Sequence, residues 1–192
     1  MNERNKGKKY VYKEIAPAAA IKDTIEKIWT FDAAPDPVDN KQFNLLADYT
    51  SSLIINQQPR SKKPSILVSG PNLMNVPIAN IPGSKIIAFR FITLKMNAAF
   101  GIVPGDIKNK AVDLNRLIEP ELFEKLYGLA ADNDDLEQLI NSVSAFLSER
   151  DFPGKYRSDR IIEEFRVRII KSRGMLKLEQ EYAKLTLGTR QS

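Results

Sequence analysis

The chain has 192 residues, a net charge of +5 at pH 7, and neither cysteine nor histidine. Without cysteine it forms no disulfides and no thiolate metal sites. Without histidine it lacks the commonest general base and the commonest transition-metal ligand, so a histidine-ligated metal enzyme is excluded.

The length suits one large domain, or a domain with a small appendage, and is enough to bury a core. The N-terminal residues are polar and charged, and no apolar run approaches eighteen residues. We therefore expect no signal peptide, no membrane partner and a cytoplasmic location.

In chain order, the first part of the sequence predicts short strands separated by turns. Residues 1–9 are expected to be disordered, residues 18–25 have the apolar spacing of a short helix, and residues 33–40, with two prolines, predict a loop. Strands are expected at 10–15, 27–31, 42–47, 51–56, 65–69, 73–78, 85–93 and 111–114. Short strands at such close spacing favour an antiparallel sandwich or small barrel, with residues 85–93 in its centre.

After residue 93 the periodicity becomes helical. Residues 94–100 are expected to form one or two helical turns, and residues 101–109 a loop. Pro120 suits a first helical turn, and apolar residues at three–four spacing predict one helix after it and another over 136–147. The acidic stretch 132–135 lacks the glycine and glutamate positions of a calcium loop, so it is expected to cap the second helix.

The charge is distributed unevenly along the chain. It amounts to +3 over residues 1–16, −3 over residues 17–153 and +5 over residues 154–192. A basic tail on a slightly acidic body suits attraction to phosphate, although a lysine-rich terminus can equally be a solvated segment. The tail itself predicts a long amphipathic helix, a break at Gly174 and a shorter helix. This is the layout of a helix-turn-helix unit whose third helix has only begun.

The end of the tail resembles the DNA-binding domain of AraC-type transcription regulators. Residues 187–191, Leu-Gly-Thr-Arg-Gln, are similar to the stretch that opens their recognition helix. Residues 178–183 are similar to their second helix, with Ala183 as the small residue of the helix crossing. Two departures are that Gly188 stands where the family has serine, and that the spacing from Ala183 is one residue short.

The body of the chain resembles an N-terminal domain of the same regulators. The matching features are a tyrosine-containing strand leading into Pro17 and on to Trp29, the Gly70-Pro71 loop, Pro82-Gly83 before the strand Ala88-Phe89-Arg90-Phe91, and the polar stretch 106–117. The family's Pro-Asp-Gly before the third strand reads Ala47-Asp48-Tyr49 here.

The resemblance implies a fold class and a domain division. It implies an α+β protein with a cupin-like antiparallel β-barrel or sandwich over residues 10–117. A helical subdomain over residues 118–153 would follow it. Residues 154–192 would be a basic helical segment that corresponds to the start of an AraC-type helix-turn-helix domain.

A barrel of this kind can hold one small ligand in its interior. The aromatic residues that could line it are Trp29, Phe31, Tyr49, Phe89 and Phe91. The alternative is that these side chains simply fill the barrel. Because Phe89 and Phe91 share one strand face, Arg90 is expected to point the opposite way, exposed or at a rim.

For DNA, the resemblance implies contacts from the basic tail. It places Thr189, Arg190 and Gln191 at or near the major groove, and Arg166, Lys171, Arg173 and Lys177 near phosphates. A recognition helix of three or four residues cannot hold itself in a groove. We therefore expect this chain alone to bind DNA weakly and without sequence preference.

Two functions from different classes remain open. The first is the sensor or dimerisation domain of an AraC-type regulator with an incomplete DNA-binding domain. Its partners would be DNA in a full-length context, a small-molecule effector and a second copy of the chain. The second is a stand-alone cupin-like protein that binds a small molecule or a protein partner. A third hypothesis, less favoured by the sequence, is an enzyme acting through Asp48 and Asp106. We expect no catalytic activity, no cofactor and no metal.

Overall fold

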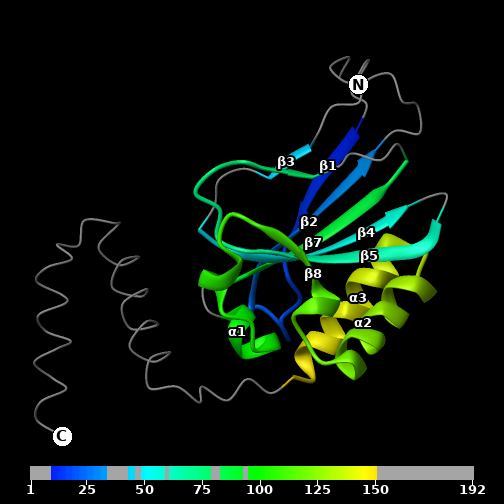
Figure 1. Cartoon of the computed structure of the whole chain (residues 1–192). Helices are drawn as coiled ribbons and strands as arrows, with labels where there is room; N and C mark the ends of the chain where they lie inside the picture. Colours follow the sequence, from blue (N-terminus) through cyan, green and yellow to red (C-terminus); the bar gives the residue numbers. More distant parts are fainter. Residues whose placement is uncertain are drawn as a thin grey trace, which may run out of the picture. The chain divides into compact units, whose positions relative to one another are not determined.

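The computed structural model describes residues 10–33, 43–45, 49–58, 61–78, 83–92 and 95–150 (Figure 1). The chain divides into two compact units, Met1–Asp151 and Phe152–Ser192, and the described residues all belong to the first. The expected disordered segment 1–9, the expected loop after residue 33 and the expected helix-turn-helix start 154–192 lie outside the described residues.

The described part of the chain runs from short strands into helices. The strands are β1 (Tyr10–Ile15), β2 (Ile25–Ala33), β3 (Phe43–Leu45), β4 (Ser51–Gln58), β5 (Ser61–Ser69), β6 (Val76–Ile78), β7 (Lys85–Phe91) and β8 (Ala111–Asp113). The helices are α1 (Lys95–Phe100), α2 (Pro120–Asp132) and α3 (Leu136–Ser148), with 3₁₀ turns η2 (Pro104–Ile107) and η3 (Leu114–Arg116). The α+β class expected from the sequence is confirmed.

Six strands form one antiparallel sheet in the order β1-β2-β7-β4-β5-β8, and β3 pairs separately with β6. The pairs β4–β5, β3–β6 and β2–β7 are nested: the chain runs outward through three strands and returns beside them in the reverse order. Strand β7 lies inside the sheet between β2 and β4, as predicted. Its residues from Ile86 to Phe89 are fully buried, which suits a strand covered on both faces.

One face of the sheet is covered by α2 and α3 and is called here the helix face (Figure 1). Ile28, Leu53 and Phe89 align on it across β2, β4 and β7, each with at most 1% of its surface exposed. The helices meet these residues with an apolar stripe at three–four spacing, made up of Leu126, Ala130, Leu139, Val143 and Leu147. Burial of this stripe is what stabilises helices of this length.

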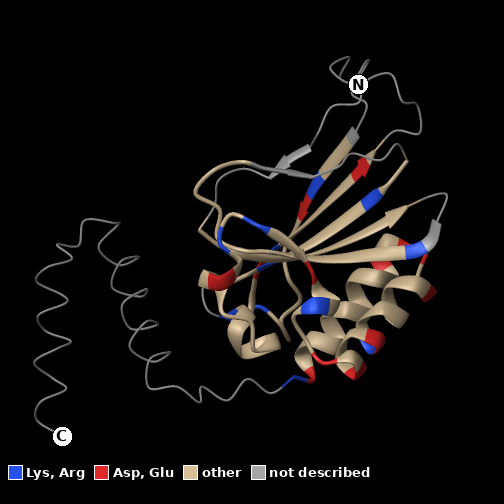
Figure 2. Ribbon diagram, viewed as in Figure 1, with Lys and Arg blue, Asp and Glu red and all other residues tan. Residues whose placement is uncertain are grey.

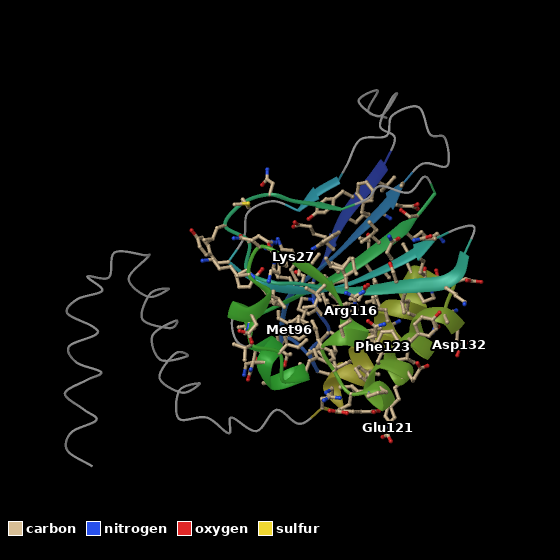
Figure 3. All side chains as sticks on the ribbon, viewed as in Figure 1. Lys27, Met96, Arg116, Glu121, Phe123 and Asp132 are labelled. Carbon is tan, nitrogen blue, oxygen red and sulfur yellow. The ribbon has the colours of Figure 1, made fainter. Side chains whose placement is uncertain are left out.

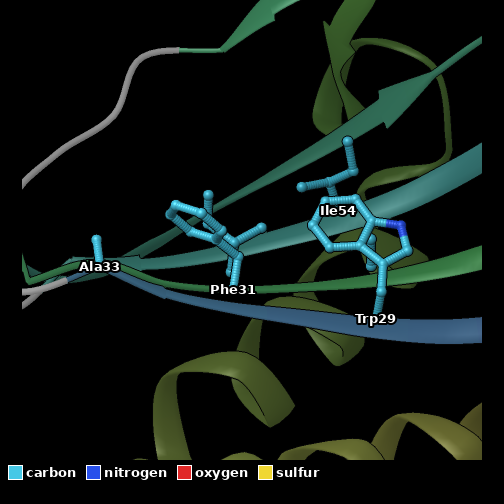
Figure 4. Packing of buried hydrophobic residues seen from close by; sticks show 6 residues of the cluster. Trp29, Phe31, Ala33 and Ile54 are labelled. Carbon is cyan, nitrogen blue, oxygen red and sulfur yellow. The ribbon is translucent and has the colours of Figure 1, made fainter. Parts of the chain in front are cut away.

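Neighbouring residues in a strand point to opposite sides of the sheet, so Trp29, next to Ile28, lies on the opposite face. This face is called here the Trp29 face. Trp29 aligns there with Ala88 of β7, which in turn faces Ile54 of β4. Phe31 lies two residues further along β2 on the same face. Figure 4 shows Trp29, Phe31 and Ile54 on the side of the strands away from the helices.

Residues 18–25 do not form the helix that the apolar spacing predicts, and that prediction is wrong. They form hydrogen-bonded turns in which Ile21 N donates to Ala18 O at 3.0 Å and Ile25 N donates to Ile21 O at 2.7 Å. Strand β2 then begins at Ile25, which pairs with Phe91. A single turn is enough to bury both Ile21 and Ile25. From Ile25 on, the backbone pairs with β7 instead of continuing into a second helical turn.

The strands differ from the predictions mainly at their ends. Strand β5 begins at Ser61 rather than residue 65, and its register against β4 shifts between Asn56 and Gln58. Pro64 lies in the shifted part, where the lack of an N–H donor does not break a regular ladder. Strand β6 covers only Val76–Ile78 of the expected 73–78, and Leu73 before it is half exposed in a bend.

The two long helices begin and end through specific side chains. Figure 3 marks α2 by Glu121, Phe123 and Asp132. At the end of α2, Asn133 Nδ2 donates to Leu129 O at 2.8 Å. Within the acidic stretch 132–135, Asp135 is the residue that caps α3, because its Oδ2 accepts from Gln138 N at 3.1 Å.

Candidate functional site

The sheet separates the aromatic residues that were expected to line one ligand site. Trp29 and Phe31 share the Trp29 face, whereas Phe89 and Phe91 lie on the helix face and are fully buried. Tyr49 lies in a bend and is 78% exposed. The structure therefore brings together only the first two of the five.

Trp29 and Phe31 are packed side chains. They are 6% and 3% exposed and belong to one cluster with Ile54, Ile86, Ala33 and Ala88, against which Leu67 packs (Figure 4). These residues come from β2, β4, β5 and β7, so the cluster ties the strands of the sheet together. The packing agrees with the alternative in which the aromatic residues fill the fold.

A polar network borders this cluster at strand β1. Tyr12 Oη donates to Glu14 Oε1 at 2.7 Å, and Lys27 Nζ donates to Glu14 Oε2 at 2.9 Å. The Tyr12 ring lies 6.3 Å from the Trp29 ring, measured between centroids. Lys27, labelled in Figure 3, comes from β2, so the network fastens the edge strand β1 to its neighbour.

These contacts shift two pKa values in opposite directions. Burial, followed by the hydrogen bond to Glu14 and its charge, raises the pKa of Tyr12 to about 12. The hydrogen bond from Lys27 and then that from Tyr12 lower the pKa of Glu14, and the Arg90 charge acts in the same direction. Arg90 is half buried and lies opposite Lys27 in the register of β7 against β2. Its side chain is therefore on the Trp29 face and that of Phe89 on the helix face, as the alternation within the strand predicts.

A half-open cavity of about 470 Å³ lies on the helix side of β1 and β2, against α3. This volume is within the range of roughly 300–1,000 Å³ that is usual for small-molecule sites. The short side chains of Ala16 and Ala18, where the chain leaves β1, leave room beside the helix. The lining is formed by Lys13, Ile15, Ala16, Ala18, Ile28, Thr30, Asp135, Leu136, Glu137, Ile140, Asn141 and Ser144.

Ser144 gives this cavity a buried polar group. It is 8% exposed, and its Oγ makes no hydrogen bond to any residue that the structure describes. A buried hydroxyl without a partner costs about 1–3 kcal/mol, so a ligand that bonded to it would recover part of that cost. Ser144 was not predicted as a site residue because this serine lies inside the apolar stripe of α3, beside Val143. Its polarity within that stripe was the available signal.

Charged side chains of both signs stand at the cavity. Lys13 comes from β1, and Asp135 and Glu137 come from the first turn of α3. Asp135 is engaged as the helix cap. Lys13 and Glu137 are exposed and make no ion pair with the described residues. Figure 2 shows acidic residues on α2 and α3 and residues of both signs on the strands.

The remaining residues singled out from the sequence are not brought together. The seven expected DNA-contact residues and Asp48 lie outside the described residues, and Asp106 is exposed on η2. Among the described residues, no group of three or more acidic side chains is placed to hold a metal ion. None of the described helices has the length and apolar character needed to cross a membrane.

Comparison with protein-family models finds no match for this chain, and neither do comparisons with curated proteins and with solved structures.

Proposed function

We propose that the described domain is the effector-sensing domain of an AraC-type transcription regulator, and that residues 154–192 belong to its DNA-binding part. The observation that carries the sensing role is the 470 Å³ cavity between β1–β2 and α3. Half of its lining residues are apolar and half are polar or charged, so it offers a ligand both apolar contact and groups that can fix its orientation. A second copy of the chain is the proposed partner for dimerisation, and the cytoplasm the proposed location.

The nested strand pairing supports a cupin-like fold for this domain. A long hairpin folded back on itself pairs β4 with β5, β3 with β6 and β2 with β7. This pairing, with β2-β7-β4-β5 in one sheet and β3-β6 in another, corresponds to a jelly roll, the architecture of cupins. The fold departs from a complete jelly roll in one respect. Strand β1 pairs with β2 and strand β8 pairs with β5, so β1 and β8 do not pair with each other.

The charge of the tail supports the DNA-binding part. Residues 154–192 carry +5, while residues 17–153 carry −3, so the attraction to phosphate is concentrated in the tail. The proposal assigns Thr189, Arg190 and Gln191 to the start of a recognition helix, following the resemblance of residues 187–191 to AraC-type regulators.

The proposal is tested on the gene product of the native cell. We would tag it at the N-terminus, measure its intact mass and map the DNA that crosslinks to it. A product that carries a complete DNA-binding domain and crosslinks at discrete sites supports the proposal. An Arg190→Ala, Gln191→Ala variant is then expected to lose those sites while the protein remains folded.

The contrary result favours a stand-alone cupin-like binding protein. It would consist of a product that ends at Ser192 and crosslinks at no discrete site. The tail would then be expected to dock on a protein partner, and a copurification comparing the intact chain with one that lacks residues 154–192 would identify that partner.

A further inference from the structure

The cavity beside α3 presents opposite charges from two different elements. Lys13 stands on strand β1, and Glu137 stands in the first turn of α3, and both line the same space. Each is exposed and makes no ion pair with the described residues. The large apolar side chains of the lining are Ile15, Ile28, Leu136 and Ile140, and its uncharged polar ones are Thr30, Asn141 and Ser144.

We propose that this cavity binds a small zwitterionic molecule with an apolar side chain, chemically an α-amino acid. This inference rests on the proposed sensing role and names the ligand class of the same cavity. The ligand's carboxylate pairs with Lys13, its ammonium group pairs with Glu137, and its side chain lies against the isoleucines. Ser144 Oγ, buried and without a partner among the described residues, bonds to one of the polar groups of the ligand.

The charges of the cavity argue against the simpler ligand classes. A purely anionic ligand would meet the carboxylates of Asp135 and Glu137, and a purely cationic one would meet Lys13. A neutral polyol would leave both charges unpaired and would cover apolar walls with hydroxyl groups. A zwitterion satisfies both signs at once, and charge-assisted hydrogen bonds are the stronger ones.

The test uses three probes that share a benzyl group and differ only in charge. L-Phenylalanine carries both groups, 3-phenylpropanoate lacks the ammonium group, and 2-phenylethylamine lacks the carboxylate. Binding to the full chain is measured by titration calorimetry at pH 7, after a thermal-shift screen of the L-amino acids. We expect an apolar amino acid to bind at least about tenfold tighter than either of its truncated analogues.

Two charge-neutralising variants test which cavity residue binds the ligand's carboxylate and which binds its ammonium group. Lys13→Gln is expected to remove the advantage of phenylalanine over phenylethylamine, and Glu137→Gln its advantage over phenylpropanoate. Ser144→Ala is expected to weaken binding without lowering the melting temperature, because it deletes a hydroxyl that has no partner in the described structure. Glu124→Gln on α2, away from the cavity, is the matched control and is expected to bind like the wild type.

The inference is overturned if a folded chain binds no amino acid, or if the three probes bind equally tightly. A second variant, Ala18→Trp, distinguishes a wrong ligand class from a wrong sensing role. It places a large side chain at the cavity lining. If Ala18→Trp changes DNA occupancy in the cell while no amino acid binds, only the ligand class is wrong. If Ala18→Trp is folded and leaves DNA occupancy unchanged, sensing through this cavity is wrong as well.

Discussion

Tyr12 stands on the edge strand β1 with its hydroxyl on the Glu14 carboxylate. The neutral phenol donates this hydrogen bond, whereas a phenolate would place a second negative charge beside Glu14. Burial of the phenol, followed by this hydrogen bond and the charge of Glu14, raises the pKa of Tyr12 from 10.0 to about 12 in the folded state. The stabilisation is complete below pH 10 and is lost as the pH rises from 10 towards 12.

This predicts a late-titrating tyrosine. Absorbance at 295 nm, followed from pH 9 to 12.5 in the folded protein, is expected to show one phenolate forming near pH 12. The Tyr12→Phe variant is expected to lack that step while retaining the others. Superimposable titration curves for the two proteins would contradict the assignment.

Gly70 is a glycine at which the described fold leaves no room for a side chain. A Cβ at this position would overlap the backbone carbonyl of Ile107 in η2. Gly70 N also donates to Lys110 O at 3.1 Å, so the two segments are held close. We expect Gly70→Ala to lower the free energy of unfolding by about 1–3 kcal/mol, as overpacking does.

Gly128 provides the opposite case for comparison. It lies in α2, and an added Cβ would meet no atom within 4 Å. Gly128→Ala is expected to raise the free energy of unfolding by about 0.5–1 kcal/mol, because alanine is the better helix former. Urea denaturation of both variants checks the pair. Equal effects in the two would contradict the close approach at Gly70.

At the scale of elements, polar contacts supplement the apolar stripe, one holding α2 to the sheet and another holding the end of α3 to α1. Gln57 of β4 donates from Nε2 to the carbonyls of Ala130 and Asn133. These carbonyls belong to the end of α2, where the helix leaves backbone acceptors unpaired. At the end of α3, Arg150 Nε donates to Ala99 O at 2.8 Å, and its guanidinium lies 5.6 Å from the centre of the Phe100 ring in α1.

The partly buried Gln57 contact predicts a clear loss of stability when its donor is removed. Gln57→Leu keeps the size of the side chain but leaves the helix-end carbonyls without their donor, at an expected cost of about 1–3 kcal/mol. Gln58→Leu, one residue further along β4, is the control and is expected to change stability by less than about 0.5 kcal/mol. Chemical denaturation followed by circular dichroism compares the two. Equal losses would show that the contact does not hold α2.

At the scale of the whole molecule, charge is divided between an acidic body and a basic tail. If the tail meets DNA through phosphates alone, binding by this chain is expected to weaken steeply with salt and to ignore base sequence. Fluorescence anisotropy on two unrelated duplexes, each from 50 to 200 mM salt, measures both properties. Replacing Lys171 by glutamine is expected to reduce the salt slope by about one. A footprint of this chain at one defined sequence would contradict the prediction.

The order of strands and helices could be predicted from the sequence because periods of 2 and 3.6 residues are local properties. The central place of β7 followed from its apolar run, and the position of Arg90 opposite to Phe89 followed from alternation within one strand. The helix predicted at residues 18–25 failed because Ile25 is held by pairing with Phe91, a contact between residues far apart in the chain.

The sequence by itself therefore determined the α+β class, most of the elements and the division of charge. Only the tertiary structure decided which side chains share a surface, because the strand register places Trp29 and Phe91 on opposite faces of one sheet. It likewise decided the cavity, whose walls come from β1 and β2 and from α3, which follows these strands by more than a hundred residues in the chain. Local periodicity says which face of an element is buried, but which other element buries that face depends on long-range packing.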